Sequence, residues 1–523
     1  MFARTSSCHF EGLATEVVSV EAEILKGFSQ FTIVGLAGTS IQEAKERIRS
    51  AIYAMDVRLP LGRIVINLYP GDVHKAGTQW DLPMAVTLLS AMGRIPASAI
   101  ASAAFLGELS LDGHLRSVPG ALAMVLALKR SGKTMIYLPA ENALACSVVE
   151  GVTLYPVQHL RQVEAILQKK VTIQPIQGGK KETSEEPLPT FSMDFADLRG
   201  QEPLKRLLEI AVAGRHSVLL VGPPGVGKTM AMSRLPGILP RLHHEEEMDV
   251  LRIQSMSGQS CAAHPFPPFR APHHTVTRAA FLGGGNPPVP GEISLAHKGI
   301  LFLDEMPQFS RDIINGLRTP MEEQRIVLIR SRRRLEAPAD FQLMATANPC
   351  PCGYYGDPDH ACSCTAPEIR RYRSRLPGPL IDRMDMLYRV TRPSMEEQKV
   401  TLSGDGDVDI KTPVLDSLTM RNNIERARSR QLDRYQHESF SVNARFMNQR
   451  DISPLHPTKE ALILLDRLCT HEHLSLRVRR RLLLVARSIA DIDDKEEVDE
   501  GAVGEAFQYR RATDGWGEDS FSV

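Results

Sequence analysis

The eight residues 222–229, which read Gly-Pro-Pro-Gly-Val-Gly-Lys-Thr, constrain the fold of this chain more than any other stretch. They match the phosphate-binding pattern GxxxxGK[ST] at every fixed position, and an apolar run at residues 217–221 precedes them. Glycines let backbone N–H groups curl around a polyphosphate, and the helix that follows directs its positive end at the same point. A chance glycine-rich turn is the alternative, but it does not explain the strand pattern before the loop. We therefore predict an α/β domain that binds a nucleoside triphosphate.

The loop residues have distinct expected roles. Lys228 is placed to reach the β- and γ-phosphates, and the Thr229 hydroxyl is placed to bind Mg²⁺. The predicted cofactors are therefore ATP and Mg²⁺. The expected nucleotide-binding residues are Gly222, Pro223, Pro224, Gly225, Val226, Gly227, Lys228 and Thr229.

Two further strand patterns end in polar residues downstream of this loop. Residues 299–303 are mostly apolar and lead directly into Asp304 and Glu305. Parallel strands present such side chains at their C-terminal edge, where α/β sheets bind ligands. We expect Asp304 to hold Mg²⁺ and Glu305 to act as general base toward the attacking water. The strand at residues 341–347 ends at Asn348, which would orient that water or sense the γ-phosphate; an isolated Asn after a strand is otherwise a turn residue.

The length and charge of the chain limit the classes of protein to which it can belong. A chain of 523 residues predicts two to four domains. Lysine plus arginine and aspartate plus glutamate both number 62, so a nucleic-acid surface would have to be a local patch. The sequence has no run of 18 apolar residues and its start does not resemble a signal peptide, so we expect a soluble cytoplasmic protein without a membrane partner.

Four of the eight cysteines crowd into residues 350–364. Cys350, Cys352, Cys362 and Cys364 form two C-x-C pairs, and four thiolates are the donor set of a closed structural zinc site. The spacing is tighter than the usual two-to-four-residue gap. Asp357, Asp359 and His360 lie between the pairs, so a histidine in place of one cysteine is an alternative, as are four free buried cysteines. We predict a structural zinc knuckle.

Arginines gather between two apolar segments just before the third strand. Arg330, Arg332, Arg333 and Arg334 would occupy the tip of a hairpin, where they could bind phosphates without reading sequence. A solvated charged face is the alternative. A second basic run at residues 370–375 contains Tyr372 and could contact DNA or a neighbouring subunit.

The chain divides at changes of composition. We predict a mixed α/β domain at residues 1–170, a charged Gly/Pro-bearing linker at 171–192, a nucleotide-binding core at 193–392, a helical lid at 393–515 and a tail at 516–523. The hairpin at residues 107–115 should turn at Asp112-Gly113.

The N-terminal domain resembles that of Mg-chelatase-like ATPases, which shares its fold with the Lon peptidase domain. The resemblance rests on residues 67–70, 75–83 and 107–111. Where it would place the catalytic serine, residues 78–81 read Thr-Gln-Trp-Asp. Where it would place the lysine, residues 118–124 contain none. A nucleophile without its activating base is inert, so the resemblance implies a Lon-like domain without peptidase activity.

Five further motifs resemble the ComM/YifB family of Mg-chelatase-like AAA+ ATPases. They lie at residues 269–275, 283–285, 290–299, 348–353 and 378–385. The resemblance implies a hexameric DNA motor that drives branch migration during natural transformation. It implies that Asn348 is the first sensor, that Arg383 is an arginine finger, with Arg375 as substitute, and that Arg477 is a second sensor. A surface ion pair of Arg383 with Asp382 or Asp385 is the alternative.

Two other function classes stay open. One is the ATPase subunit of magnesium chelatase itself, which usually lacks an N-terminal domain of this kind; the cysteine knuckle and the arginine hairpin also fit a nucleic-acid motor more naturally. The other is an ATP-dependent protein remodeller, which should carry an aromatic pore loop. The nearest stretch to such a loop is residues 281–285, Phe-Leu-Gly-Gly-Gly, which is equally suited to a packing turn.

Overall fold

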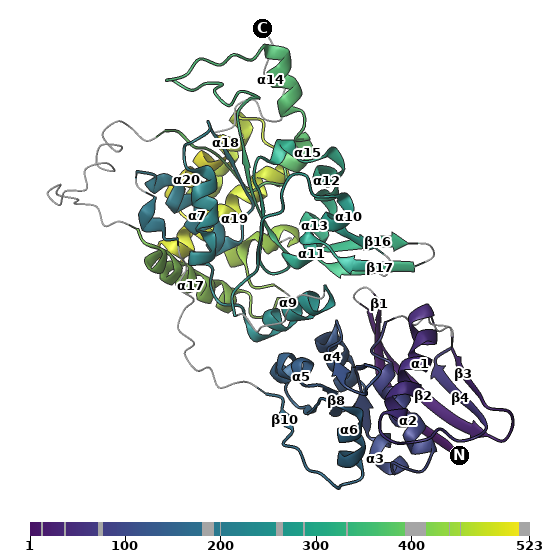
Figure 1. Cartoon of the computed structure of the whole chain (residues 1–523). Helices are drawn as coiled ribbons and strands as arrows, with labels where there is room; N and C mark the ends of the chain where they lie inside the picture. Colours follow the sequence, from purple (N-terminus) through teal and green to yellow (C-terminus); the bar gives the residue numbers. More distant parts are fainter. Residues whose placement is uncertain are drawn as a thin grey trace, which may run out of the picture.

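The computed structural model describes most of the chain. The described ranges are residues 1–11, 14–35, 38–71, 77–179, 193–198, 200–257, 265–285, 288–330, 333–392, 415–438, 440–449 and 451–511. Figure 1 shows an N-terminal body in purple and blue and a second body in teal to yellow. Most of the predicted linker and all of the predicted tail lie outside the described residues.

The N-terminal body is built on an eight-stranded sheet with the order β10-β9-β8-β5-β1-β2-β4-β3. Its strands are β1 Phe2–Glu11, β2 Ala14–Leu25, β3 Gln30–Val34, β4 Arg63–Tyr69, β5 Ala103–Phe105, β8 Met135–Pro139, β9 Thr153–Val157 and β10 Ile176–Gln177. Its helices are α1 Thr39–Tyr53, α2 Asp81–Ala91, α3 Ala97–Ala101, α4 Ala121–Arg130, α5 Ala140–Ala145 and α6 Leu160–Leu167. Every residue of α2 is buried, so this helix runs through the core.

Two features of this sheet differ from the sequence interpretation. The long strand β1 was missed because its alternation is weak: the buried side chains of Ala3, Thr5 and Ser7 are small or polar. Residues 105–111 do not continue as one strand, because β5 ends at Phe105 and β6 belongs to another sheet. There β6 Glu108–Leu109 pairs antiparallel with β7 Leu115–Arg116, which confirms the predicted hairpin.

The residues at the Lon-like serine position are packed into the core. Gln79, Trp80 and Asp81 are all at most 2% exposed. Arg47 donates to both carboxylate oxygens of Asp81, at 2.7 and 3.0 Å. Burial nevertheless raises the pKa of Asp81 to about 6. The side chains at this position therefore serve internal contacts.

The second body is organised around a five-stranded sheet with the order β12-β15-β18-β11-β19. The strands are β11 Val218–Val221, β12 Phe269–Arg270, β15 Ile300–Leu303, β18 Gln342–Ala347 and β19 Met386–Arg389. All four pairings are parallel, so the C-terminal ends of the strands share one edge of the sheet. The helices are α7 Glu202–Gly214, α8 Lys228–Ser233, α9 His244–Met256, α10 Arg278–Leu282, α11 Glu292–Leu295, α12 Arg311–Gly316, α13 Arg318–Glu323, α14 Ala366–Arg373 and α15 Gly378–Ile381.

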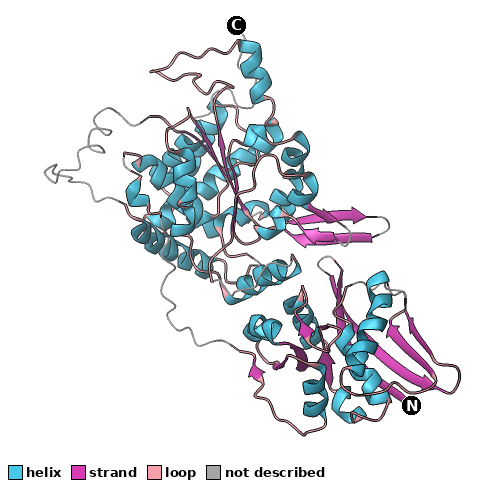
Figure 2. Ribbon diagram, in the orientation of Figure 1, coloured by secondary structure: helices cyan, strands magenta, loops and turns pink. Residues whose placement is uncertain are grey.

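Two antiparallel hairpins extend this body. They are formed by β13 Gly283–Gly285 with β14 Pro288–Pro290, and by β16 Arg325–Arg330 with β17 Arg333–Pro338. Figure 2 shows the second hairpin in magenta, projecting away from the helices. The hairpin expected before the third strand is therefore confirmed. Arg332 lies outside the described residues, as do the side chains of Arg330, Arg333 and Arg334.

The C-terminal part is helical, as expected. Its helices are α17 Ser417–Arg434, α18 Lys459–His471, α19 Leu476–Ile492 and α20 Glu500–Arg511. Helices α17 and α19 both pack on α7, so the lid and the sheet share one hydrophobic core. In the part of the chain that the structure describes, no helix is long and apolar enough to cross a membrane.

Helix α9 connects the two bodies. Its side chains Met248 and Leu251 join the hydrophobic cluster beneath α4 of the N-terminal body. The backbone N–H of Gly120, at the start of α4, donates to the carbonyl of Ser255 at 2.9 Å. The N-terminal body is thus docked on a helix of the second body.

Candidate nucleotide-binding site

The phosphate-binding loop joins β11 to α8 at the C-terminal edge of the five-stranded sheet. Gly227 has a φ of 89°, a left-handed conformation that glycine adopts without strain. At Gly222 a Cβ atom would lie 2.5 Å from the carbonyl oxygen of Val390, at the end of β19. These two glycines therefore let the loop turn tightly above the sheet.

Lys228 is held inside this loop. Its Nζ donates to the carbonyl oxygens of Gly222 at 2.5 Å and Pro223 at 2.7 Å, and to Oδ1 of Asn348 at 3.2 Å. Burial lowers the pKa of Lys228 to about 8, although Asp304 and Glu305 oppose that shift. The third strand thus brings Asn348 within hydrogen-bonding distance of Lys228.

Asp304 and Thr229 meet at the same edge. The Thr229 hydroxyl donates to both carboxylate oxygens of Asp304, at 3.1 and 3.2 Å. Thr346 on β18 donates to Asp304 at 2.5 Å and accepts from the backbone N–H of Glu305 at 2.9 Å. A hydroxyl and a carboxylate beside a phosphate loop are the hard oxygen donors that Mg²⁺ uses. Thr346 was missed, although its place two residues before Asn348 puts both on one face of the strand.

Glu305 sits in an unusual backbone conformation. Its φ of 51° places it in the left-handed region, which is uncommon for a residue with a side chain. The side-chain amide of Gln308 donates to its carboxylate, so Glu305 is oriented from the next turn of the chain. Gln308 carried no signal in the sequence, because this contact depends on the short 3-10 turn Met306–Gln308.

Arg383 and Arg477 do not join this site within the chain. Both pair with Glu322 on α13, with Nε of Arg383 at 2.9 Å from its carboxylate. These ion pairs hold the pKa of Glu322 below its usual value although burial opposes this. Asp385, one of the two acids that the sequence offered as partners of Arg383, instead pairs with Arg481 and accepts from Ser217.

The strand directions explain this separation. Arg383 precedes β19 and Lys228 follows β11, and these two strands are parallel neighbours. The two arginines therefore lie at the N-terminal edge of the sheet, opposite the phosphate loop. There they line a cavity of about 630 Å³ together with the first residues of β18.

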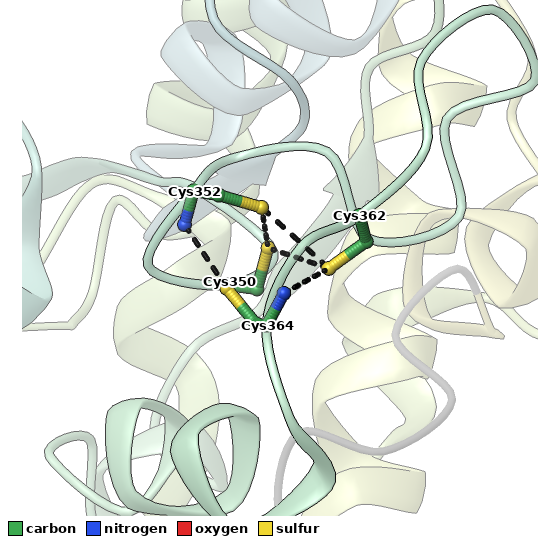
Figure 3. Close-up of side chains that lie close together, drawn as sticks. All are labelled: Cys350, Cys352, Cys362 and Cys364. Carbon is green, nitrogen blue, oxygen red and sulfur yellow. Dashed lines mark hydrogen bonds between the residues drawn. The ribbon is translucent and has the colours of Figure 1, made fainter.

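The four cysteines form one cluster, drawn in Figure 3. Their sulfur atoms all lie within 4.8 Å of one another, and the closest pairs are 3.3 to 3.6 Å apart. Tetrahedral zinc with bonds of about 2.3 Å places its sulfurs roughly 3.8 Å apart, so the geometry fits zinc. His360 instead stacks on Tyr354, with ring centroids 5.0 Å apart.

The cysteine loop also touches the phosphate loop. A Cβ on Gly353 would lie 2.8 Å from Cδ of Pro224. Two arginines hold the far side of this loop. Arg389, the last residue of β19, donates to the carbonyl of Gly356 at 2.6 Å, and Arg392, three residues later, pairs with Asp357 at 3.2 Å. The cluster therefore braces the segment that follows Asn348.

Family models and similar proteins match nearly the whole chain. The family described as magnesium chelatase, subunit ChlI, matches residues 194–398, its C-terminal part matches 415–510, and a further subunit ChlI family matches 20–142. The chain is 38% identical over 506 residues to the uncharacterized protein YifB of Salmonella typhimurium, covering 95% of both chains. It is 34% identical over 509 residues to competence protein ComM of Haemophilus influenzae, again covering 95% of both.

A third similarity concerns the N-terminal part. Lon protease of Brevibacillus choshinensis is 30% identical over 178 residues, which are 32% of this chain and 22% of that protein. This similarity agrees with the Lon-like α/β fold expected there. Because the matches to YifB and ComM extend over nearly the whole chain, the protein belongs to the ComM/YifB family of Mg-chelatase-like AAA+ ATPases.

Proposed function

We propose that this protein is a homohexameric, ATP-hydrolysing DNA motor that promotes branch migration of recombination intermediates, as in natural transformation. The observation that carries the proposal is the placement of Arg383 and Arg477 opposite the phosphate loop. A finger that cannot reach its own nucleotide acts on that of a neighbouring copy, so hydrolysis requires assembly. Lys228, Thr229, Asp304, Glu305 and Asn348 supply the other half of each shared site.

DNA is the proposed substrate for two reasons. The hairpin β16–β17 projects from the body and has an arginine-rich turn, and arginines bind phosphates without reading base sequence. The ComM relative is named a competence protein. The test is ATP turnover with and without a four-way DNA junction, with junction resolution followed in the same sample. Stimulated turnover with resolution supports the motor, and turnover indifferent to DNA contradicts it.

Magnesium chelatase chemistry is the second candidate, because all three family matches carry that subunit's description. In that case turnover would respond to the partner subunits of a chelatase and not to DNA. The same junction experiment therefore separates the two functions.

Replacing Arg332, Arg333 and Arg334 with Ala should weaken single-stranded DNA binding and leave ATP-dependent assembly intact. Each phosphate contact contributes about 0.7 to the slope of log K against log salt, so the slope should fall by about 2. Fluorescence anisotropy over a salt series measures both quantities. Arg325→Ala at the base of the hairpin, where the arginine pairs with Glu323 and Glu336, is the matched control. An unchanged slope would make the tip a plain solvated surface.

Cys362→Ser should lower the zinc content from about one atom per chain and reduce ATP turnover. The second effect is expected because the cysteine loop packs on Pro224 and follows Asn348. Metal analysis of purified protein and a turnover assay check the two effects. Ser363→Ala, between two of the cysteines and exposed, should change neither. Wild-type protein free of zinc with full turnover would contradict the zinc assignment.

A further inference from the structure

A second cavity lies at the edge of the sheet away from the phosphate loop. Its volume is about 340 Å³. Its floor is formed by the first residues of β15 and β18, and one wall by helix α17 of the lid. The opposite wall is the segment 239–243 that leads into α9. None of the residues assigned above to nucleotide, magnesium, zinc or DNA lines it.

The walls combine apolar surface with positive charge. The apolar lining residues are Leu239, Pro240, Leu242, Pro267, Ile300 and Leu432. The cationic ones are Arg215, Arg241, Lys298 and Arg428, against the two acids Glu246 and Glu425. Pockets of this composition bind small organic molecules, whose orientation is fixed by a few polar groups.

Two of the four cations are neutralised by acids inside the protein. Arg215 and Lys298 both pair with Asp340, at 3.4 and 2.9 Å, and Lys298 also pairs with Glu246 at 3.5 Å. Glu425 also lines the cavity and is exposed.

Arg428 differs from Arg215 and Lys298. Its guanidinium donates to the carbonyl of Val212 at 2.8 Å, but its Nε is buried without a hydrogen-bond partner. Among the described residues no carboxylate forms an ion pair with it. Burial and the nearby Arg215 lower the pKa of Arg428 to about 9, although Glu246 and Asp340 oppose that shift. These acids thus offset only part of the cost of desolvating this half-buried guanidinium, which favours an anion that enters the cavity.

We propose that this cavity binds a small organic phosphate of mononucleotide size, with its phosphate on Arg428 and its apolar ring against Leu242 and Leu432. A guanidinium presents two parallel donors to a phosphate, and the cavity is large enough for one ring system beside it. The ligand would bridge α17 of the lid to the sheet. The site is independent of the motor function proposed above, because it shares no residue with the candidate nucleotide-binding site.

The test uses the full chain carrying Lys228→Ala, which removes binding at the phosphate loop, with AMP as the probe in titration calorimetry. The expected result is saturable binding of AMP that is at least tenfold tighter than binding of adenosine. Adding Arg428→Met should weaken AMP binding at least tenfold, whereas Arg426→Met should not change it. Arg426 lies on the same helix but outside the cavity, bonded to Asn423.

Two outcomes would overturn the proposal: no saturable binding of AMP at millimolar concentration, or equal binding with and without Arg428. A 5′-phosphorylated oligonucleotide forms a second arm. Arg428-dependent binding of AMP alone identifies a free nucleotide as the ligand, and equal binding of the oligonucleotide identifies a strand end with the same chemistry. Thermal melting of both arginine variants without ligand shows whether each remains folded.

Discussion

Replacing Glu305 with Gln should leave ATP binding intact and lower ATP turnover by about 10²–10⁴-fold. Gln keeps the shape of the side chain but cannot accept a proton from the attacking water. Binding should survive because Lys228, Thr229 and the glycines of the loop are untouched. Stopped-flow binding of a fluorescent ATP analogue and steady-state phosphate release measure the two properties separately.

Two further variants sharpen this experiment. Gln308→Leu removes the hydrogen bond to the Glu305 carboxylate, so turnover should fall by a smaller factor than in Glu305→Gln. Glu323→Gln changes an exposed acid that pairs with Arg325 and should leave turnover unchanged. Brisk hydrolysis by Glu305→Gln would remove Glu305 from the role of general base.

The sheet edge that carries Lys228, Asp304 and Asn348 could be predicted from the sequence, because each strand that ends there is short, apolar and followed at once by its polar residues. Such strands are buried and parallel, so the loop of Lys228 and the ends at Asp304 and Asn348 had to meet. What the sequence could not supply are contacts between residues distant in the chain. Thr346 and Gln308 have no pattern of their own, and Glu322 came from a helix that no motif marked.

The N-terminal body was harder to predict for a different reason. Its central strand β1 faces the core with Ala3, Thr5 and Ser7. The hydroxyls of Thr5 and Ser7 donate to the carbonyls of Ile100 and Phe105, which lie near or in β5. Hydrogen bonds replace apolar burial there, so the strand shows little hydrophobic alternation. The docking of α9 on α4 likewise depends on two helices separated by more than one hundred residues.

Arg383→Ala should reduce turnover by about 10³-fold or more, the usual contribution of an arginine finger. The decisive experiment mixes this variant with Lys228→Ala, which is inactive for a different reason. If Arg383 acts on the neighbouring subunit, a mixed assembly contains interfaces with an intact loop from one chain and an intact arginine from the other. The mixture should therefore recover turnover that neither variant has alone.

The positions of Arg383 and Lys228 make recovery of turnover a strict test of action on the neighbouring subunit. Within one chain Arg383 and Lys228 lie at opposite ends of parallel strands, so a finger acting on its own nucleotide is not compatible with this fold. Arg375→Ala is the matched control: Arg375 contacts the carbonyl of Pro307 at 3.4 Å, and its loss should lower turnover far less. We expect Arg477→Ala to complement Lys228→Ala in the same way, because Glu322 holds both arginines at one edge. The opposite result is a mixture that assembles, as judged by light scattering, but is as inactive as either variant alone. That result would mean that Arg383 serves only in a structural ion pair with Glu322.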